Sequence, residues 1–202
     1  MLVIPNNAVV LFQGDSITDV GRNREDSTDL GSGYVMMAAS WFNATHPKKH
    51  VKFLNRGVSG DVATGLRARW QEDCLDLKPT IVSIMIGIND CFFGVENAVY
   101  EEAYRSILTD TSEKLNAELI LIEPFGVPAS INPTPRPDLD IKINIVRKLA
   151  RKFKATLIPM DGIFAKASTL REPDFWAPDS VHPTSAGHAL MARAWLEAVG
   201  AL

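Results

Sequence analysis

Three side chains in this sequence could together perform serine-type acyl transfer, which needs a nucleophile, a base and a group that orients the base. Ser16 closes the triplet Gly14-Asp15-Ser16, and Asp179 stands three residues before His182. At that spacing both can lie on one tight turn, where the carboxylate holds Nδ1–H of the imidazole and Nε2 faces the serine. Plainer interpretations stay open, because Gly, Asp and Ser all favour turns and the second motif can instead mark the start of a helix.

Two other motifs could supply hydrogen-bond donors to the oxyanion that forms when a serine attacks an ester. Asn89, within residues 87–90 (Gly-Ile-Asn-Asp), carries a side-chain amide at the end of an apolar run. Gly60 ends residues 55–60 (Asn-Arg-Gly-Val-Ser-Gly), and a glycine lets its backbone N–H approach a ligand closely. The alternatives are an ordinary turn for the first motif and, for the second, a loop before a helix with Asp61 as its N-cap.

Polar and aromatic neighbours of these motifs receive secondary roles. We expect Asp15 and Asp90 to be structural carboxylates that tie the turns on which they lie. Phe92, Phe93 and Trp176 could line an acyl pocket, although packing in the core is the simpler interpretation for at least one of the three.

These motifs need elements that bring them to one place. Five continuous apolar runs are typical of parallel strands buried on both faces, and they cover residues 8–12, 51–54, 80–86, 118–122 and 156–158. Helical patterns alternate with them at residues 33–44, 62–75, 98–116, 138–154 and 185–199. The alternation predicts an α/β fold with a parallel sheet covered on both sides. Two loops, residues 18–32 and the proline-rich residues 124–137, follow strands at the carboxyl edge, where open α/β sheets bind ligands.

Composition narrows the class of protein. The chain has 202 residues, 46% of them hydrophobic, and a net charge of −3. This length predicts a single domain over residues 1–202, and the weak charge gives no reason to expect nucleic acid or an anionic membrane as a partner. No run approaches the roughly 18 apolar residues of a membrane span, and the N-terminus lacks the pattern of a signal peptide. Because Cys74 and Cys91 are isolated, we expect a cytoplasmic protein without a disulfide or a zinc site.

The order of the motifs resembles the block pattern of the GDSL/SGNH hydrolases, whose four characteristic residues match Ser16, Gly60, Asn89 and His182. The resemblance covers nearly the whole chain. It implies a three-layer α/β/α sandwich with a flavodoxin-like, five-stranded parallel sheet. It also implies Ser16 as nucleophile, His182 as base and Asp179 as orienting acid, with an oxyanion hole made by the N–H groups of Ser16 and Gly60 and the side chain of Asn89.

A narrower resemblance is to the intracellular bacterial acetylxylan esterases of this superfamily, and its segments are residues 14–22, 30–35, 67–70, 83–90 and 181–196. It implies removal of acetyl groups from xylo-oligosaccharides or similar sugars, hence a small-molecule ester substrate, and assembly into homo-oligomers. The proline-rich residues 125–137 do not follow that subfamily. Acyl transfer by these side chains requires no metal and no organic cofactor.

Three alternatives remain beside this interpretation. A lysophospholipase or acyl-thioesterase for longer acyl chains would need an extended apolar groove. A flavodoxin-like domain that binds a phosphate would need a glycine-rich phosphate loop after the first strand, and the sequence lacks one. An inactive carbohydrate-binding relative would be expected to lose Ser16, Asp179 or His182, and all three are present. We therefore expect a serine esterase for short acyl chains.

Overall fold

The computed structural model describes residues 2–129 and 134–202 and shows a five-stranded sheet within them. The strands are β1 (Val9–Gly14), β2 (Lys52–Asn55), β3 (Ile81–Met85), β4 (Glu118–Ile122) and β5 (Thr156–Ile158). They lie in the order β2-β1-β3-β4-β5, and each neighbouring pair is parallel. The predicted α/β fold with a five-stranded parallel sheet is confirmed.

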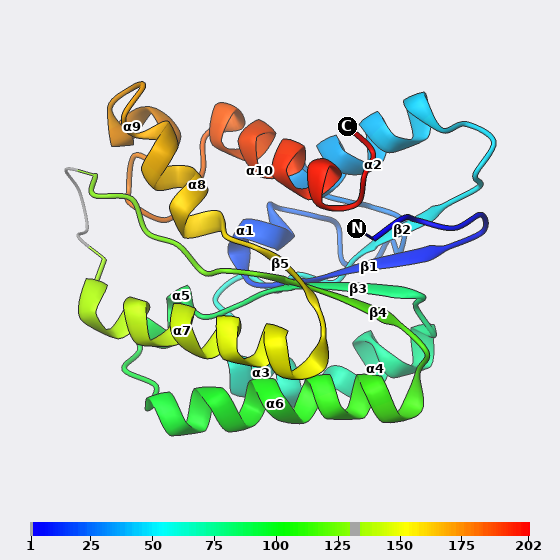
Figure 1. The fold of residues 1–202 in the computed structure, drawn as a ribbon, viewed down its shortest axis with the longest axis horizontal. Coiled ribbons are helices and arrows are strands. Elements are labelled where there is room, and N and C mark those ends of the chain that lie inside the picture. Colours follow the sequence, from blue (N-terminus) through cyan, green and yellow to red (C-terminus); the bar gives the residue numbers. More distant parts are fainter. Residues whose placement is uncertain (1, 130–133) are drawn as a thin grey trace.

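Helices cover both faces of the sheet and give the three layers that Figure 1 shows. One face carries α2 (Tyr34–Thr45), α8 (Met160–Ala167), α9 (Pro173–Trp176) and α10 (Ser185–Ala198). The other face carries α3 (Ala63–Ala68), α4 (Trp70–Asp73), α6 (Asn97–Lys114) and α7 (Arg136–Phe153). Such crossover helices are needed because parallel strands must all start at the same edge.

Strand side chains pack alternately into two hydrophobic cores, one on each face of the sheet. On β1, Val10 and Phe12 join the core of the α2–α10 face, whereas Leu11 joins the core of the α3–α6 face. Trp195 is buried in the first core and Trp70 in the second. Burial on both faces explains why the strands read as continuous apolar runs.

Residues 62–75 do not form the single helix that their periodicity predicts. The chain breaks at Arg69, between α3 and α4, and the 3₁₀ turn η1 (Leu75–Leu77) follows. The Arg69 guanidinium points back to the Gly14 carbonyl (3.3 Å) and pairs with the Asp61 carboxylate (2.8 Å). Tertiary contacts of this kind override local helix propensity.

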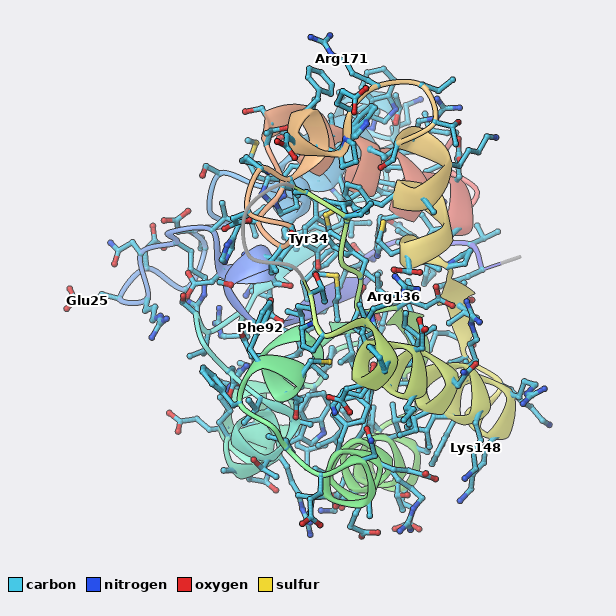
Figure 2. All side chains as sticks on the ribbon, turned by 90° about the vertical axis from the view of Figure 1, so that its left-hand side faces the viewer. Glu25, Tyr34, Phe92, Arg136, Lys148 and Arg171 are labelled. Atoms are coloured by element: carbon cyan, nitrogen blue, oxygen red, sulfur yellow. The ribbon has the colours of Figure 1, made fainter. Side chains whose placement is uncertain are left out.

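Two short helices replace turns at the edge where the strands end, and Figure 2 looks onto that edge. Helix α1 (Ser16–Asp19) follows β1, and α5 (Ile88–Phe92) follows β3. The loop after α1 projects outward in Figure 2, with Glu25 at its tip. Of the proline-rich loop predicted at residues 124–137, residues 130–133 lie outside the described part of the chain.

Candidate active site

Ser16, His182 and Asp179 form one chain of hydrogen bonds, although 166 positions separate the serine from the histidine. Ser16 Oγ lies 2.9 Å from His182 Nε2, and the other ring nitrogen, Nδ1, lies 2.6 Å from Asp179 Oδ2. An ionised carboxylate can only accept, so Nδ1 carries the ring proton, and Nε2 of the neutral ring can accept the serine proton. The arrangement has the geometry of a nucleophile, a base and an orienting acid.

The turn between β1 and α1 holds Ser16 in place. Asp15 is the N-cap of α1, and its Oδ1 accepts the Ile17 N–H (3.0 Å), as expected for a structural carboxylate. A side chain at Gly14 would collide with the Met85 carbonyl on β3, so this close approach requires glycine. Asp15 is buried, and burial raises its pKa to about 7. Buried contacts therefore determine where the serine lies.

His182 and Asp179 lie on a partly exposed loop before α10, where their side chains are 56% and 37% exposed. Asp179 Oδ1 accepts the N–H groups of His182 (2.7 Å) and Val181 (3.1 Å), so one carboxylate holds both the turn and the imidazole. Partial burial raises the pKa of Asp179, but hydrogen bonds from the His182 ring and the two N–H groups outweigh it and keep the pKa below its usual value. Thr184, not Asp179, is the N-cap of α10, so the helix start does not account for the aspartate.

The predicted oxyanion donors belong to three segments at this edge of the sheet. Asn89 Nδ2 donates to the Asp61 carbonyl (3.0 Å), which joins α5 to the loop that carries Gly60. The amide has a second N–H, and no described residue accepts it. The backbone N–H groups of Ser16 and Gly60 likewise have no acceptor within residues 2–129 and 134–202. Gly60 has a φ of +81°, which favours glycine, and the part of all three donors in an oxyanion hole stays a prediction.

Asp61 does not take the part that the sequence suggests, and Asp90 is a structural carboxylate with a wider reach than expected. Asp61 is not an N-cap, because Val62 occupies that position of α3 and the Asp61 carboxylate pairs with Arg69. Asp90 reaches beyond its own turn, since its carboxylate accepts the Ala63 N–H at the start of α3 (3.1 Å). Burial raises the pKa of Asp90 to about 6. The two carboxylates thus fasten α3, and the loop before it, to its surroundings.

Asp19 holds the same loop from the side of α1, a contact that the sequence analysis missed. Its Oδ2 accepts the Ser59 N–H (2.9 Å) and pairs with Arg24 (2.6 Å). Because Gly60 follows Ser59 directly, this bond helps to set the direction of the Gly60 N–H. A signal was available, since Asp19 falls within residues 14–22, one of the segments that resemble the acetylxylan esterases.

The aromatic residues predicted for an acyl pocket differ in exposure. Phe92 and Phe93 are 43% and 67% exposed, and Figure 2 shows Phe92 near α1. Trp176 packs against the core of the α2–α10 face, and its Nε1 donates to the Arg171 carbonyl (3.3 Å). Core packing therefore accounts for Trp176 and not for the two phenylalanines. A hollow lies beside Ser16, and none of these three aromatic residues is among the described residues that line it. Their part in an acyl pocket therefore stays a prediction.

That hollow has a volume of about 310 Å³ and is lined by residues 19–22, Arg24 and Ser59 in addition to Ser16. Its walls come from α1, the loop after it and the loop before α3, which also carry the nucleophile and Gly60. Elsewhere, no cluster of three or more His, Cys, Asp or Glu side chains suited to a metal ion occurs among the described residues. Nor does a helix long and apolar enough to cross a membrane occur in that part of the chain.

Comparison with known proteins decides the class to which this geometry belongs. The chain matches the GDSL-like lipase/acylhydrolase family over residues 12–190, a range that includes all the motifs described above. The chain belongs to this family. It is a carboxylic ester hydrolase, as the order of its motifs predicts.

Individual relatives match this hydrolase over almost their whole lengths. An acetylxylan esterase from Geobacillus stearothermophilus is 34% identical over 205 residues, which cover 95% of this chain and 93% of the relative. A crystal structure of an acetylxylan esterase from that organism is 33% identical, with a TM-score of 0.91 over 98% of this chain and 97% of the other. A GDSL-like protein from Parabacteroides merdae is 35% identical, with a TM-score of 0.95 over 100% and 99%. The SGNH hydrolase fold is thereby confirmed.

Proposed function

We propose that this hydrolase removes acetyl groups from acetylated saccharides, with Ser16 as nucleophile, His182 as base and Asp179 as orienting acid. The observation that carries the proposal is the pair of hydrogen bonds, 2.9 Å and 2.6 Å long, that joins the three side chains through one imidazole ring. The similar acetylxylan esterases support acetate as the acyl group and a saccharide as the alcohol.

Hydrolysis proceeds in two acyl-transfer steps. His182 Nε2 accepts the proton of the Ser16 hydroxyl while Oγ attacks the ester carbonyl, and Asp179 stabilises the resulting imidazolium. His182 then gives the proton to the leaving alcohol, which departs and leaves an acetyl group on Ser16. In the second step His182 takes a proton from water while the water oxygen attacks the acyl carbon, and His182 then gives this proton to Ser16 Oγ as acetic acid leaves and ionises in water.

The negative charge that develops on the ester oxygen needs donors fixed before the reaction starts. We assign this part to the backbone N–H groups of Ser16 and Gly60 and to the Asn89 amide. Two observations support the assignment: the Asn89 amide is oriented by the Asp61 carbonyl, and the Gly60 loop is fastened by Asp19 through Ser59. Donors held in this way need no reorganisation when the charge appears.

The nucleophile can be tested by covalent labelling with a fluorophosphonate probe. Wild-type enzyme should take up one label, and Ser16→Ala should take up none while its activity on 4-nitrophenyl acetate falls by about 10⁴ to 10⁶. Ser40→Ala, at an exposed serine on α2, is the matched control and should behave as wild type. Activity of Ser16→Ala within tenfold of wild type would exclude Ser16 as the nucleophile.

The acyl preference separates this proposal from a lysophospholipase or acyl-thioesterase. Because Trp176 packs against the core, Phe92 and Phe93, which follow the Asn89 turn directly, remain the candidates for limiting the room beyond the acetyl methyl. If one of them fills that space, a longer acyl chain must displace it, which costs about 1–3 kcal/mol. We expect kcat/KM to fall about ten- to hundredfold from 4-nitrophenyl acetate to the octanoate. Equal or rising values with chain length would instead favour the long-chain enzymes.

Three further features belong to the proposal. One sheet, with cores on both faces, runs through the described chain, which supports a single catalytic domain over residues 1–202.

An apolar hollow of about 280 Å³ lies between α2 and α10, and the 52% exposed Trp41 lines it. This hollow supports a homo-oligomer, which light scattering after size-exclusion chromatography would test. Cys74 and Cys91 are free thiols, which supports a cytoplasmic location.

A further inference from the structure

The hollow beside Ser16 has charged walls that the acyl-transfer steps leave unused. It is lined by residues 19–22, Arg24 and Ser59, and most of this lining belongs to α1 and the loop that follows it. In Figure 2 the same loop projects from the carboxyl edge of the sheet, with Glu25 at its tip. A chemical group bound in this hollow would lie next to the serine, within reach of the alcohol part of an ester under attack.

Among the described residues that line the hollow, Arg22 is the charged one that forms no ion pair. Its two guanidinium groups belong to Arg22 and Arg24, and its single carboxylate, that of Asp19, is occupied by Arg24 and by the Ser59 N–H. Arg22 Nε donates to the Gly57 carbonyl (3.0 Å). In the described part of the chain no carboxylate oxygen lies within 4.0 Å of the Arg22 guanidinium. Its four remaining N–H donors, on Nη1 and Nη2, have no acceptor among those residues.

Burial makes this unpaired charge unfavourable in the free enzyme. Arg22 is only 8% exposed. Burial lowers the pKa of Arg22 below its usual value, and the guanidinium groups of Arg56 and Arg24 lower it further, whereas the carboxylates of Asp19 and Asp73 raise it in part. Nη1 and Nη2 of Arg22 still reach solvent. A fully buried nitrogen without a partner would be among the unsatisfied buried atoms of the described residues, and neither is. An anion entering the hollow would therefore replace the missing counter-charge.

We propose that the hollow is a subsite for a carboxylate on the alcohol part of the ester, such as that of an acetylated uronic acid, held by Arg22. The inference rests on the proposed esterase function and narrows its substrate class. An acetyl group carries no charge, so the anion must belong to the alcohol. The planar fork of a guanidinium matches the two oxygens of a carboxylate, and one uncompensated charge suits a singly charged group better than a phosphate monoester, which carries nearly two.

A purely structural part for Arg22 predicts a different result. Through the Gly57 carbonyl, Arg22 fastens the loop that leads to Gly60, so its loss can slow the hydrolysis of every ester. A structural defect lowers kcat/KM for charged and neutral esters by the same factor. Loss of a carboxylate subsite instead changes the ratio between the two.

The test uses two acetylated methyl glucuronosides that differ only in the uronic group, which is a carboxylate in one and a carboxamide in the other. At low ionic strength, wild-type enzyme should prefer the acid about tenfold in kcat/KM, because charge-assisted hydrogen bonds are roughly twice as strong as neutral ones. Arg22→Gln should bring the ratio close to one, and Arg22→Lys should retain part of it. Arg151→Gln, at an exposed arginine near the end of α7, removes the same net charge at a distant site and should leave the ratio unchanged.

Each outcome decides between the subsite and its alternatives. Equal kcat/KM values for acid and amide in wild-type enzyme would overturn the subsite while leaving the esterase function intact. A preference for the acid that survives in Arg22→Gln would also overturn it, even where overall activity falls. If the enzyme hydrolysed none of the three compounds, the two sugars and 4-nitrophenyl acetate, the esterase proposal would be overturned, and the subsite with it.

Discussion

The two halves of the candidate site are held in different ways. The nucleophile half, which comprises the β1–α1 turn, the Gly60 loop and α5, is fastened by polar side chains that are each at most 4% exposed, namely Asp15, Asp19, Asn55 and Asp90. The acid–base half is the loop of residues 179–182, where the His182 side chain is more than half exposed. The nucleophile half must hold donors in place for a transition-state charge, whereas the imidazole must also meet water and the leaving alcohol.

The range of the contacts differs in the same way. In the nucleophile half, Asn55 Nδ2 donates to the carbonyls of Thr18 (2.6 Å) and Leu30 (2.9 Å), which are 37 and 25 positions away. In the acid–base half, the carboxylate and the imidazole are three positions apart on one turn. The first half therefore depends on several distant segments. The pairing of carboxylate and imidazole in the second half is local, although the Val127 N–H donates to the Ser180 carbonyl (3.0 Å) and joins this turn to the segment after β4. Substitutions in the first half should change both rate and stability, and substitutions in the second should change the rate alone.

Asp179→Asn should give the largest effect that separates the two halves. The asparagine keeps an oxygen for the two backbone N–H groups, but its NH₂ group faces Nδ1 and favours the wrong tautomer of His182. We expect kcat to fall by about 10⁴. Because the turn is partly exposed, the free energy of unfolding should change by no more than about 0.5 kcal/mol, or about 2 °C in Tm.

Steady-state kinetics and differential scanning calorimetry on the same preparation would measure both quantities. Asp76→Asn, at an exposed aspartate on η1, serves as the control for the chemical change. A fall of several degrees in the Tm of Asp179→Asn would show that the acid–base loop stabilises the fold as the nucleophile half does, and the contrast between the halves would be lost.

Asn89→Ala tests the nucleophile half, and its effect on the rate should be smaller. Loss of one oxyanion donor lowers kcat by about 10²–10³. The change also leaves the Asp61 carbonyl without its donor, so stability should fall by about 1 kcal/mol. Kinetics with 4-nitrophenyl acetate and urea unfolding would measure the two effects. A raised KM with unchanged kcat would mean that the amide binds the substrate rather than the transition state.

The sheet and the main helices could be predicted because their signals are local. Apolar runs such as residues 8–12 and 118–122 identify β1 and β4 to within two residues, and burial on both faces makes such runs continuous. The predicted helix at residues 62–75 fails at Arg69, because this guanidinium also binds Gln13 and other groups far away in the sequence. No periodicity within the segment carries that information.

The candidate site divides in the same way between local and distant signals. The spacing of Asp179 and His182 predicts their shared turn, and the order of the motifs predicts that Ser16 meets them. Asp19 lies in a segment that resembles the acetylxylan esterases, but its contact with Ser59 and that of Asp90 with Ala63 could not be predicted. Each contact joins a short helix at the carboxyl edge to a segment whose approach depends on the packed sheet. The groups proposed for the chemistry could thus be predicted from the sequence, whereas most of the groups that hold them in place could not.

The last expected effect concerns stability rather than rate, and it is a pH dependence at Asp15. Its pKa is about 7 in the folded chain against a usual value of 3.8, so the folded state binds the proton more tightly, and its contribution to stability is complete below about pH 4 and lost as the pH rises through 7. Asp15→Asn keeps an oxygen for the Ile17 N–H and cannot ionise. When the pH is raised from about 5 to 8, the free energy of unfolding of wild-type enzyme, measured by urea denaturation, should therefore fall on the order of 2–3 kcal/mol further than that of Asp15→Asn. Glu113→Gln, at an exposed residue of α6, should follow wild type. If the free energies of unfolding of wild type and Asp15→Asn changed with pH in parallel, burial would not raise the pKa of the carboxyl beside the nucleophile. The contrast between a buried and an exposed half of the site would then not hold for Asp15.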